Sequence, residues 1–423
     1  MNNRNYYLLM LFLLLAMGRT YGQAEPPVIK NGFLDARLLD LNSQRLPLRG
    51  SWIWFDNQLL TPDETKTAKG VPVDFPKIWN EVRANKSGQG YATYTVSILL
   101  PAAIPVYGLD IPEPYCSYRL WANGYLISQH GQVGTTKETT TPVWFSTAVS
   151  VPKPKGDTLH LVLQIANFHH FKGGIKNDFY LGGESIILKK RNNATVSTLI
   201  ECGTLFVMGF IFLLLFFQQK KKIIIYFALF CFTWSLRSVL SNDYVFFQYF
   251  PDFNWTLAIK FEYLTLYLTM IWCILYLSRL FVNESYAVIK HVLVTINIAF
   301  ILFTFLTPTV LFTQWLFVYL TVAGILLLYG GSIVIRASIN ERVGSTFLVL
   351  TILMGVVVFG YDFLTYQGIF PFNAFLISSG YIATFLLMAF ALLLHLNVIK
   401  SKPKTTNILT YAELYKDDTY KVK

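Results

Sequence analysis

The most restrictive feature of this sequence is a series of apolar segments, each about as long as a membrane span. The first contains an apolar run from about Leu205 to Phe217, which the mildly polar residues 195–204 extend and which ends at Lys220, Lys221 and Lys222. A helix needs about 20 residues to cross ~30 Å of hydrocarbon. Windows of that length predict seven spans: 195–217, 223–240, 261–280, 292–311, 314–335, 345–364 and 374–397.

The chain divides into two parts of different character. At 54% hydrophobic and 14% charged over 423 residues, it is too apolar for an ordinary soluble enzyme, yet the residues before 194 are mixed in polarity. We therefore predict a soluble domain over 23–193, a membrane domain over 194–399 and a short tail over 400–423. The net charge of +11 does not indicate nucleic-acid binding, because the lysines and arginines form no single basic helix or arm.

Residues 1–22 have the pattern of a cleaved signal peptide. They carry Arg4, a short apolar core from Tyr6 to Met17, and the small or polar residues Thr20 and Gly22. An uncleaved anchor is the alternative, but this apolar core is shorter than a span.

The positive charges beside the spans predict the orientation in the membrane. On one side the connections and the tail carry Lys220, Lys221, Lys222, Arg279, Lys290, Arg336, Arg342, Lys400, Lys402, Lys404, Lys416, Lys421 and Lys423. The other side has Arg237 and Lys260, together with Lys189, Lys190 and Arg191, which close a long domain that translocates largely regardless of charge. We expect a multi-pass protein of the inner (plasma) membrane, with its first domain periplasmic or extracellular and its carboxyl terminus cytoplasmic.

The soluble domain has the alternating pattern of β-strands. One face is apolar at Tyr94, Val96, Ile98 and Leu100, and again along 159–165. Asn123-Gly124 predicts a type I′ hairpin between strands near 118–122 and 125–128, and further strands are expected at 51–56, 143–151 and 185–189. The predicted fold is an all-β jelly-roll sandwich followed by an all-α seven-helix transmembrane bundle. Its lone cysteine, Cys116, allows no internal disulfide.

Several residues of this domain are candidates for ligand binding. Aromatic platforms and hydrogen-bonding groups that recognise a flat or sugar-like ligand are offered by Trp52, Trp54, Arg119, Trp121, Asn123, Asn167, His169 and His170. Alternatively, the tryptophans fill the core, and the loop from Asn167 through Gly173-Gly174 is held by hydrogen bonds to its own backbone. The spacing of His160, His169 and His170 matches no metal-ligand motif, so we expect neither metal nor cofactor.

Ionisable residues in or near the spans are a second set of candidates. Charges there are unfavourable unless they are paired or hydrated. Glu201 in the first span and Arg237 in the second are expected at similar depth and to pair, with Lys260, Glu262 and Asp362 completing a ring of coupling residues beneath the soluble domain. Interfacial snorkelling is the alternative for Lys260 and Glu262.

Five stretches carry a resemblance to a known family: LPLRGSWIWFDNQLL, VPVDFPKIW, GYATYTVSILLP, SYRLWANGYLISQHGQVG and LVLQIANFHHFKGGI. In this order they resemble the sensory domain of bacterial seven-transmembrane receptors with diverse intracellular signalling modules, a domain similar to the galactose-binding-like jelly rolls that accompany glycoside hydrolases. The resemblance implies a receptor for a small molecule, such as a carbohydrate. The 27 residues from Asn397 are too few for the family's usual output module, so we expect a separate cytoplasmic or membrane signalling partner.

Other functions remain alternatives at this stage. One alternative is a glycan-binding or assembly protein of the envelope that does not switch, and self-association of the receptor stays open. An enzyme is disfavoured, because carboxylates such as Asp110 and Glu113 belong to no glycosidase motif. A transporter is disfavoured because neither repeated halves nor paired broken helices are visible.

Overall fold

The computed structural model describes residues 26–102, 104–154, 156–241, 243–366, 370 and 372–397. Our predictions for the signal peptide and for Lys400, Lys402 and Lys404 lie outside these ranges. The described chain forms two compact units. The first contains the residues up to 199 together with 237–264 and 302–318, and the second contains 200–236, 265–301 and the residues from 319 onward.

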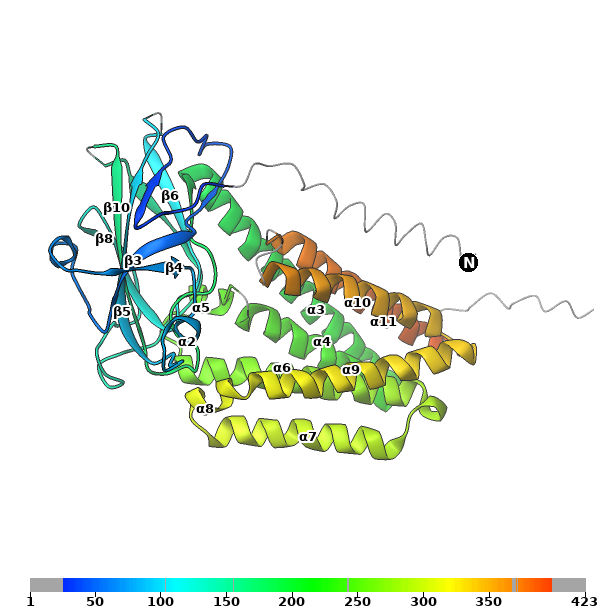
Figure 1. Ribbon diagram of the computed structural model, residues 1–423. Helices are drawn as coiled ribbons and strands as arrows, with labels where there is room; N and C mark the ends of the chain where they lie inside the picture. Colours follow the sequence, from blue (N-terminus) through cyan, green and yellow to red (C-terminus); the bar gives the residue numbers. More distant parts are fainter. Residues whose placement is uncertain are drawn as a thin grey trace, which may run out of the picture. The chain divides into compact units, whose positions relative to one another are not determined.

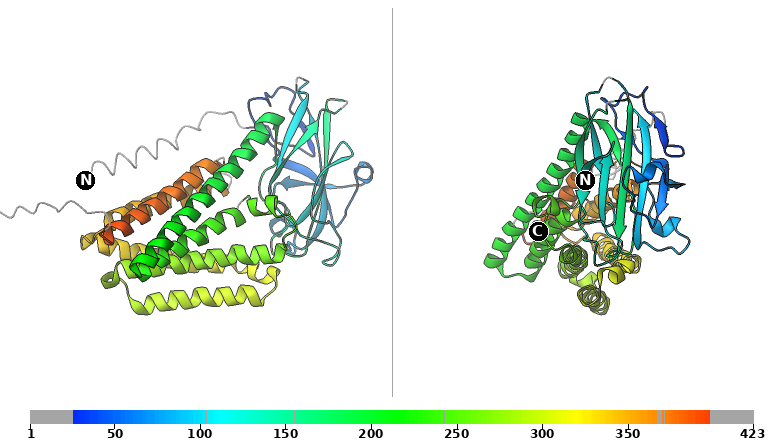
Figure 2. Two further views of the ribbon diagram at one scale, coloured as in Figure 1. Left: turned by 180° about the vertical axis from the view of Figure 1, so that it is seen from behind. Right: turned by 90° about the vertical axis from the view of Figure 1, so that its left-hand side faces the viewer.

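Two β-sheets make up the amino-terminal half (Figures 1 and 2). The larger has the order β4-β3-β5-β10-β7-β8 with β1 added to β5, and the smaller has the order β2-β11-β6-β9. All pairs are antiparallel except β1 with β5. The strands are β1 Phe33–Asp35, β2 Leu46–Pro47, β3 Gly50–Asp56, β4 Val71–Phe75, β5 Gly90–Leu99, β6 Val106–Ile111, β7 Ser117–Ala122, β8 Tyr125–His130, β9 Thr147–Pro152, β10 Thr158–Asn167 and β11 Tyr180–Gly183.

The hydrophobic core lies between these sheets, as the alternation of side chains predicts. Tyr94, Val96 and Ile98 of β5 are buried, as are the leucines of β10 and the inward-facing residues of β7. Asn123 and Gly124 both have positive φ, of 49° and 86°, and join β7 to β8 as the predicted hairpin. The all-β sandwich predicted from the sequence is confirmed.

One predicted strand is wrong. Residues 185–189 begin the helix α3 (Glu184–Gln219), which runs without interruption into the first apolar segment. This start of the helix packs on the smaller sheet at a glycine: a methyl group on Gly108 would lie 2.7 Å from Ile187 Cβ. Ile186 and Ile187 are therefore apolar because they cover a sheet, which gives a short segment the same composition as a buried strand. Similarly, only the second part of the strand expected at 143–151 forms, as β9.

Seven helices are long and apolar enough to cross a membrane, as predicted. They are α3, α4 (Lys222–Leu240), α6 (Trp255–Leu280), α7 (Ala287–Leu306), α9 (Leu316–Ile339), α10 (Ser345–Tyr366) and α11 (Ala374–His395). Short elements complete the described chain: α2 (Trp79–Val82), α5 (Val245–Tyr249), α8 (Thr309–Gln314), η2 (Glu64–Lys66) and η3 (Val282–Glu284).

The fourth span lies about one turn earlier than predicted. The prediction of 292–311 becomes α7, which ends at Leu306, because Pro308 cannot continue a helix and instead precedes α8. Within the second unit α10 and α11 pack side by side, as the orange and red helices of Figures 1 and 2 show. The predicted all-α seven-helix region is confirmed, and the chain is a multi-pass membrane protein.

Candidate functional site

The predicted ligand residues lie in three different environments within the first unit. Two are in the core, three are on or beside the face of the larger sheet that points away from the core, and three are in the loop after β10. We call that face the outer face. The three environments differ in how accessible the side chains are to a ligand.

Trp52 and Trp54 are core residues rather than ligand platforms. Trp52 is fully buried, stacks on Phe75 at a centroid distance of 4.0 Å, and donates from Nε1 to the carbonyl of Leu48 at 3.2 Å. Trp54 is buried as well and stacks on Tyr94 at 6.3 Å. Alternation along β3 directs both rings inward, so our expectation that they contact ligand is wrong.

Arg119 and Trp121 lie on the outer face, and both are partly exposed. In the register of the sheet Trp121 is opposite Val162 and Arg119 is opposite Gln164, so these four side chains form adjacent rows. The segment after β3 covers part of this face, because Gln164 Nε2 donates to the carbonyl of Leu60 at 3.0 Å. An accessible ring and a cation therefore lie beside a hydrogen-bonded loop.

A cavity of about 470 Å³ lies at the next row of the same face. It is lined by Pro62, Asp63, Lys66, Ser97, Asn123, Gly124 and His160. Asn123 thus lines a cavity, and its Oδ1 also accepts from the backbone N–H of His160 at 2.6 Å. Small-molecule sites are concave and combine apolar walls with a few polar groups, which this cavity and the neighbouring Trp121 supply.

Asn167 holds the loop 167–174 together. It is fully buried, and its Nδ2 donates to the carbonyls of Gly88, His170 and Lys172 at 2.7–2.8 Å. Its Oδ1 accepts from the backbone N–H groups of His169 and His170. With these bonds it has no capacity left for a ligand, so the alternative interpretation of a self-bonded loop holds here.

The same loop bonds to the beginning of helix α8. Thr309 Oγ1 donates to the carbonyl of His169 at 2.5 Å, and the backbone N–H of Phe171 donates to Thr313 Oγ1 at 3.1 Å. His169 also uses its Nε2 with the carbonyl of Thr140 at 3.0 Å. The two histidines predicted to bind ligand therefore belong to a contact between the sandwich and the helical segments of the same unit.

An aromatic cluster extends this contact. Trp144 packs against Tyr115, His170, Tyr244 and Trp255 at centroid distances of 5.0–5.3 Å, and Tyr115 stacks on His170 at 4.8 Å. Trp255 is the first residue of α6, and Tyr244 precedes α5. Burial of His170 lowers its pKa to about 3, so the ring is neutral in this cluster at ordinary pH.

A buried ion bridge ties three segments of the first unit. Arg191 of α3 donates from Nε to Asp110 Oδ1 of β6 at 2.9 Å and from Nη1 to Asp243 Oδ1 at 2.6 Å. The three side chains are 10–14% exposed. We refer to loop 167–174, the Trp144 cluster and the Arg191 bridge together as the joint.

We include Glu113 and Lys176 in the joint, because Glu113 interacts electrostatically with Asp243 and Arg191, and Lys176 with Lys172 and Glu113. The Glu113 carboxylate accepts from Ser146 Oγ at 2.7 Å and from Asn177 Nδ2 at 3.0 Å. Burial nevertheless raises its pKa to about 7, and burial lowers the pKa of Lys176 to about 7. The joint therefore contains groups that change charge near neutral pH.

Glu201 and Arg237, which we expected to pair with each other, have other hydrogen-bond partners. Glu201 accepts from Trp234 Nε1 at 3.0 Å, and Arg237 donates to the carbonyl of Glu262 at 3.3 Å, so each has a neighbour in place of the predicted pair. Lys260 Nζ donates to the carbonyl of Phe305 at 2.9 Å. Asp362 accepts from Tyr381 at 3.5 Å.

Sequence reasoning missed the residues that build the joint on the helical side. Thr309, Thr313, Tyr244 and Trp255 stand in connections or first turns with no motif around them. The available signal was composition: these connections are rich in aromatic residues, which a short solvated loop does not require.

Comparison with protein families identifies the helical region. Residues 195–395 match the model of the family described as 7TM diverse intracellular signalling. The helical region of this chain, residues 195–395, is therefore similar to that family, as the resemblance implied.

Solved structures similar to the sandwich are parts of larger enzymes. A GH2 β-galacturonidase from Eisenbergiella tayi is 12% identical with a TM-score of 0.26, over 33% of this chain and 24% of that one. A β-glucuronidase from Faecalibacterium prausnitzii is 16% identical with a TM-score of 0.25, over 33% and 31%. A putative β-galactosidase from Bacteroides fragilis is 16% identical with a TM-score of 0.26, over 33% and 23%. No curated protein matches the chain.

Proposed function

We propose that this protein is a receptor of the inner (plasma) membrane that binds a small molecule of carbohydrate type through its periplasmic sandwich. The seven helices pass the resulting change to a separate cytoplasmic or membrane signalling partner. The observation that carries this proposal is the joint, because it links the strands by hydrogen bonds, an ion bridge and packed rings to the segments beside α4, α6 and α8. A ligand shifts such a system only if it binds two arrangements with different affinities.

The ligand site that we propose is the outer face at Trp121 and Arg119 with the adjoining cavity at Asn123. A partly exposed indole offers a stacking surface for a sugar ring, and a guanidinium recognises hydroxyl or carboxylate oxygens. The loop at His169 and His170 is removed from this proposal, since its polar groups are engaged in the joint.

The partners of the two candidate carboxylates, Asp110 and Glu113, support a non-catalytic role. Asp110 accepts from Arg191 and Glu113 accepts from Ser146, so both serve the joint. A glycosidase requires a pair of carboxylates that face one cleft. Their arrangement favours a sensor over a hydrolase.

The binding proposal is tested with the full chain in nanodiscs. Oligosaccharides and envelope fragments are screened by thermal shift, and each hit is measured again with Trp121→Ala and with Tyr125→Ala. Tyr125 is an exposed aromatic residue of the same hairpin, 77% accessible, and is the matched control. Loss of the indole should weaken binding about tenfold or more, whereas the control should change it less than twofold. Equal losses, or no loss in either variant, would exclude the outer face as the site.

Signal transmission is tested separately from binding. Spin labels on the sandwich and on the connection after α6 report the distance between them with and without a hit. A changed distance supports a receptor, and an unchanged distance with intact binding supports an envelope-binding protein that does not switch.

A further inference from the structure

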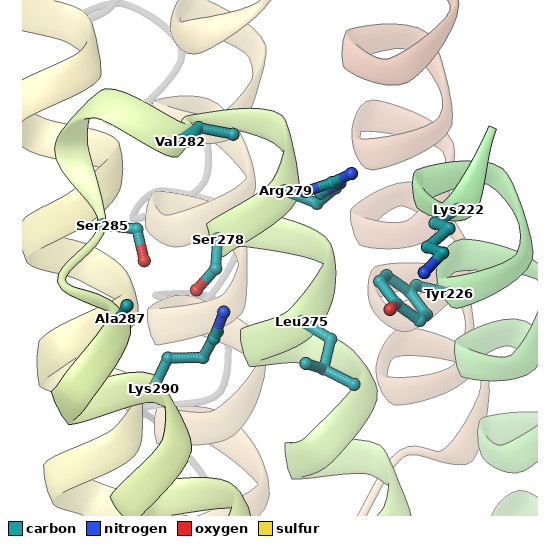
Figure 3. Close-up of a pocket in the computed structure, with 9 residues that line it drawn as sticks. All are labelled: Lys222, Tyr226, Leu275, Ser278, Arg279, Val282, Ser285, Ala287 and Lys290. Carbon is teal, nitrogen blue, oxygen red and sulfur yellow. The ribbon is translucent and has the colours of Figure 1, made fainter.

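A second cavity lies among the helices of the second unit, at the ends of α4, α6 and α7. Its volume is about 200 Å³, and it is lined by Lys222, Tyr226, Leu275, Ser278, Arg279, Val282, Ser285, Ala287 and Lys290 (Figure 3). Three of these residues are cations, and no carboxylate is among them. The cavity therefore has an unbalanced positive charge at its wall.

Two helices begin at this cavity. Lys222 is the first residue of α4 and Ala287 is the first residue of α7, and the helices have 19 and 20 residues. The first N–H groups of a helix have no partner within it, and the helix dipole places partial positive charge there. The amino-terminal ends of α4 and α7 therefore add to the positive potential of the two lysines. The positive charge of Arg279 offsets the partial negative charge at the carboxyl-terminal end of α6. Both features favour an anion.

Ser278 provides an observation that does not depend on charge. Its residue is 8% exposed, and its Oγ is buried with no hydrogen-bond partner among the described residues. In Figure 3 the side chains of Ser278 and Lys290 point toward one another within the cavity. A buried hydroxyl without a partner is unfavourable, so it indicates that an acceptor enters this space.

The nearest acidic residue in the sequence does not neutralise the site. Glu284 accepts from Arg342 Nε at 2.7 Å and from Asn340 Nδ2 at 3.3 Å, and its side chain is 3% exposed. Its charge is thus satisfied by a different part of the second unit. Within the part of the chain that the structure describes, no salt bridge engages the three cations at the cavity.

We propose that this cavity binds a phosphate group. Phosphate oxygens accept from ammonium, guanidinium, hydroxyl and helix amino-terminal N–H donors, all of which line the cavity. The same chemistry is presented by an anionic phospholipid headgroup and by a free phosphate. In the orientation that the charges predict, the site faces the cytoplasmic leaflet, where the output of the receptor would be regulated.

Native mass spectrometry of the full chain in detergent micelles distinguishes the two sources. One arm titrates dioctanoyl phosphatidylglycerol against dioctanoyl phosphatidylcholine, and the other titrates inorganic phosphate. Binding of phosphatidylglycerol alone assigns a lipid, and binding of inorganic phosphate assigns a free phosphate. Either result supports the proposed site if binding depends on the cavity residues Ser278, Arg279 and Lys290.

Single and combined substitutions test whether binding depends on these residues. Lys290→Gln should weaken binding about fivefold and Ser278→Ala about threefold, and the combination of Lys290→Gln with Arg279→Gln about 25-fold. Lys221→Gln is the matched control, because it removes the same charge from the adjacent turn but does not line the cavity. Lys290→Arg should restore affinity.

The proposal is overturned if neither probe binds, or if Lys221→Gln weakens binding as much as Lys290→Gln does. Thermal unfolding of each variant in the same detergent verifies that the fold is retained. If Lys290→Gln does not fold, Ser278→Ala, which keeps the charge, provides the decisive measurement.

Discussion

The loop 167–174 and the hairpin 117–130 carry the most specific sequence motifs of the sandwich, yet they have opposite environments. The polar groups of the loop are engaged within the protein. The two N–H donors of Asn167 lie within hydrogen-bonding distance of three carbonyls, and the backbone of the loop bonds to α8. The hairpin leaves Arg119 and Trp121 partly exposed on an open sheet face. A polar motif at the end of a buried strand is therefore as well suited to joining parts of a molecule as to binding a ligand.

The largest expected effect concerns the ion bridge of the joint. Arg191→Met leaves Asp243 without its cation and leaves Asp110 with only the longer ion pair to Arg45 at 3.5 Å, which should cost about 3 kcal/mol and lower Tm by on the order of 10 °C. Tryptophan fluorescence during heating of the full chain in nanodiscs measures this.

Arg37→Met is the control for that substitution. It breaks an ion pair whose side chains are 57% and 44% exposed, so its effect on stability should be much smaller than that of Arg191→Met. Equal effects of the two substitutions would mean that the joint contributes no more than a surface pair.

The second effect concerns the loop itself. Asn167→Ala removes the donors to three buried carbonyls, so we expect a loss of about 2–3 kcal/mol and a decrease in Tm of roughly 5 °C. Arg119→Ala on the outer face should change stability by no more than about 0.5 kcal/mol. If the Arg119 variant were the less stable of the two, the contrast between loop and hairpin would be lost.

The smallest effect is a pH dependence within the joint. Burial raises the pKa of Glu113 to about 7 in the folded chain, above its ordinary value of 4.5. The folded state therefore holds this proton more tightly, and the stability that Glu113 contributes falls as pH rises from about 4.5 to 7. His170 acts oppositely, because its pKa is lowered to about 3 and stability rises with pH up to about 6.5.

Glu113→Gln isolates the first of these contributions. The amide resembles the protonated carboxyl, so the variant should match the wild type near pH 5 and be more stable at pH 8. Melting curves at the two pH values provide the comparison. A wild type that is the more stable protein at pH 8 would contradict the account.

The sequence allowed the prediction of those features that local interactions determine. The Asn123-Gly124 turn, the alternation of β5 and β10, and the apolar spans depend on neighbours in the chain, and all form as expected. The segment 185–189 was misassigned because its isoleucines cover a sheet from a helix, a distinction that composition alone does not make.

The joint could not be predicted for a different reason. His169 and Thr309 are 140 residues apart in the sequence, and Phe171 and Thr313 are 142 apart. The local sequence of either segment therefore does not indicate which segment it contacts. Trp52 and Trp54 were predicted to bind ligand. Alternation along a strand places both rings on one face, but it does not determine whether that face packs on the second sheet. The accessible position of Trp121 became evident only from the register of β7 on β10.

Hydrogen exchange of the full chain in nanodiscs tests most directly whether the loop and helix α8 form one cooperative joint. The measurement compares wild type, Asn167→Ala and Trp121→Ala by mass spectrometry. We predict that Asn167→Ala accelerates exchange in residues 167–174 and, together with it, in 309–315, while Trp121→Ala leaves both segments protected. Faster exchange in 167–174 with unchanged exchange in 309–315 would contradict the account, because the loop would then move without α8.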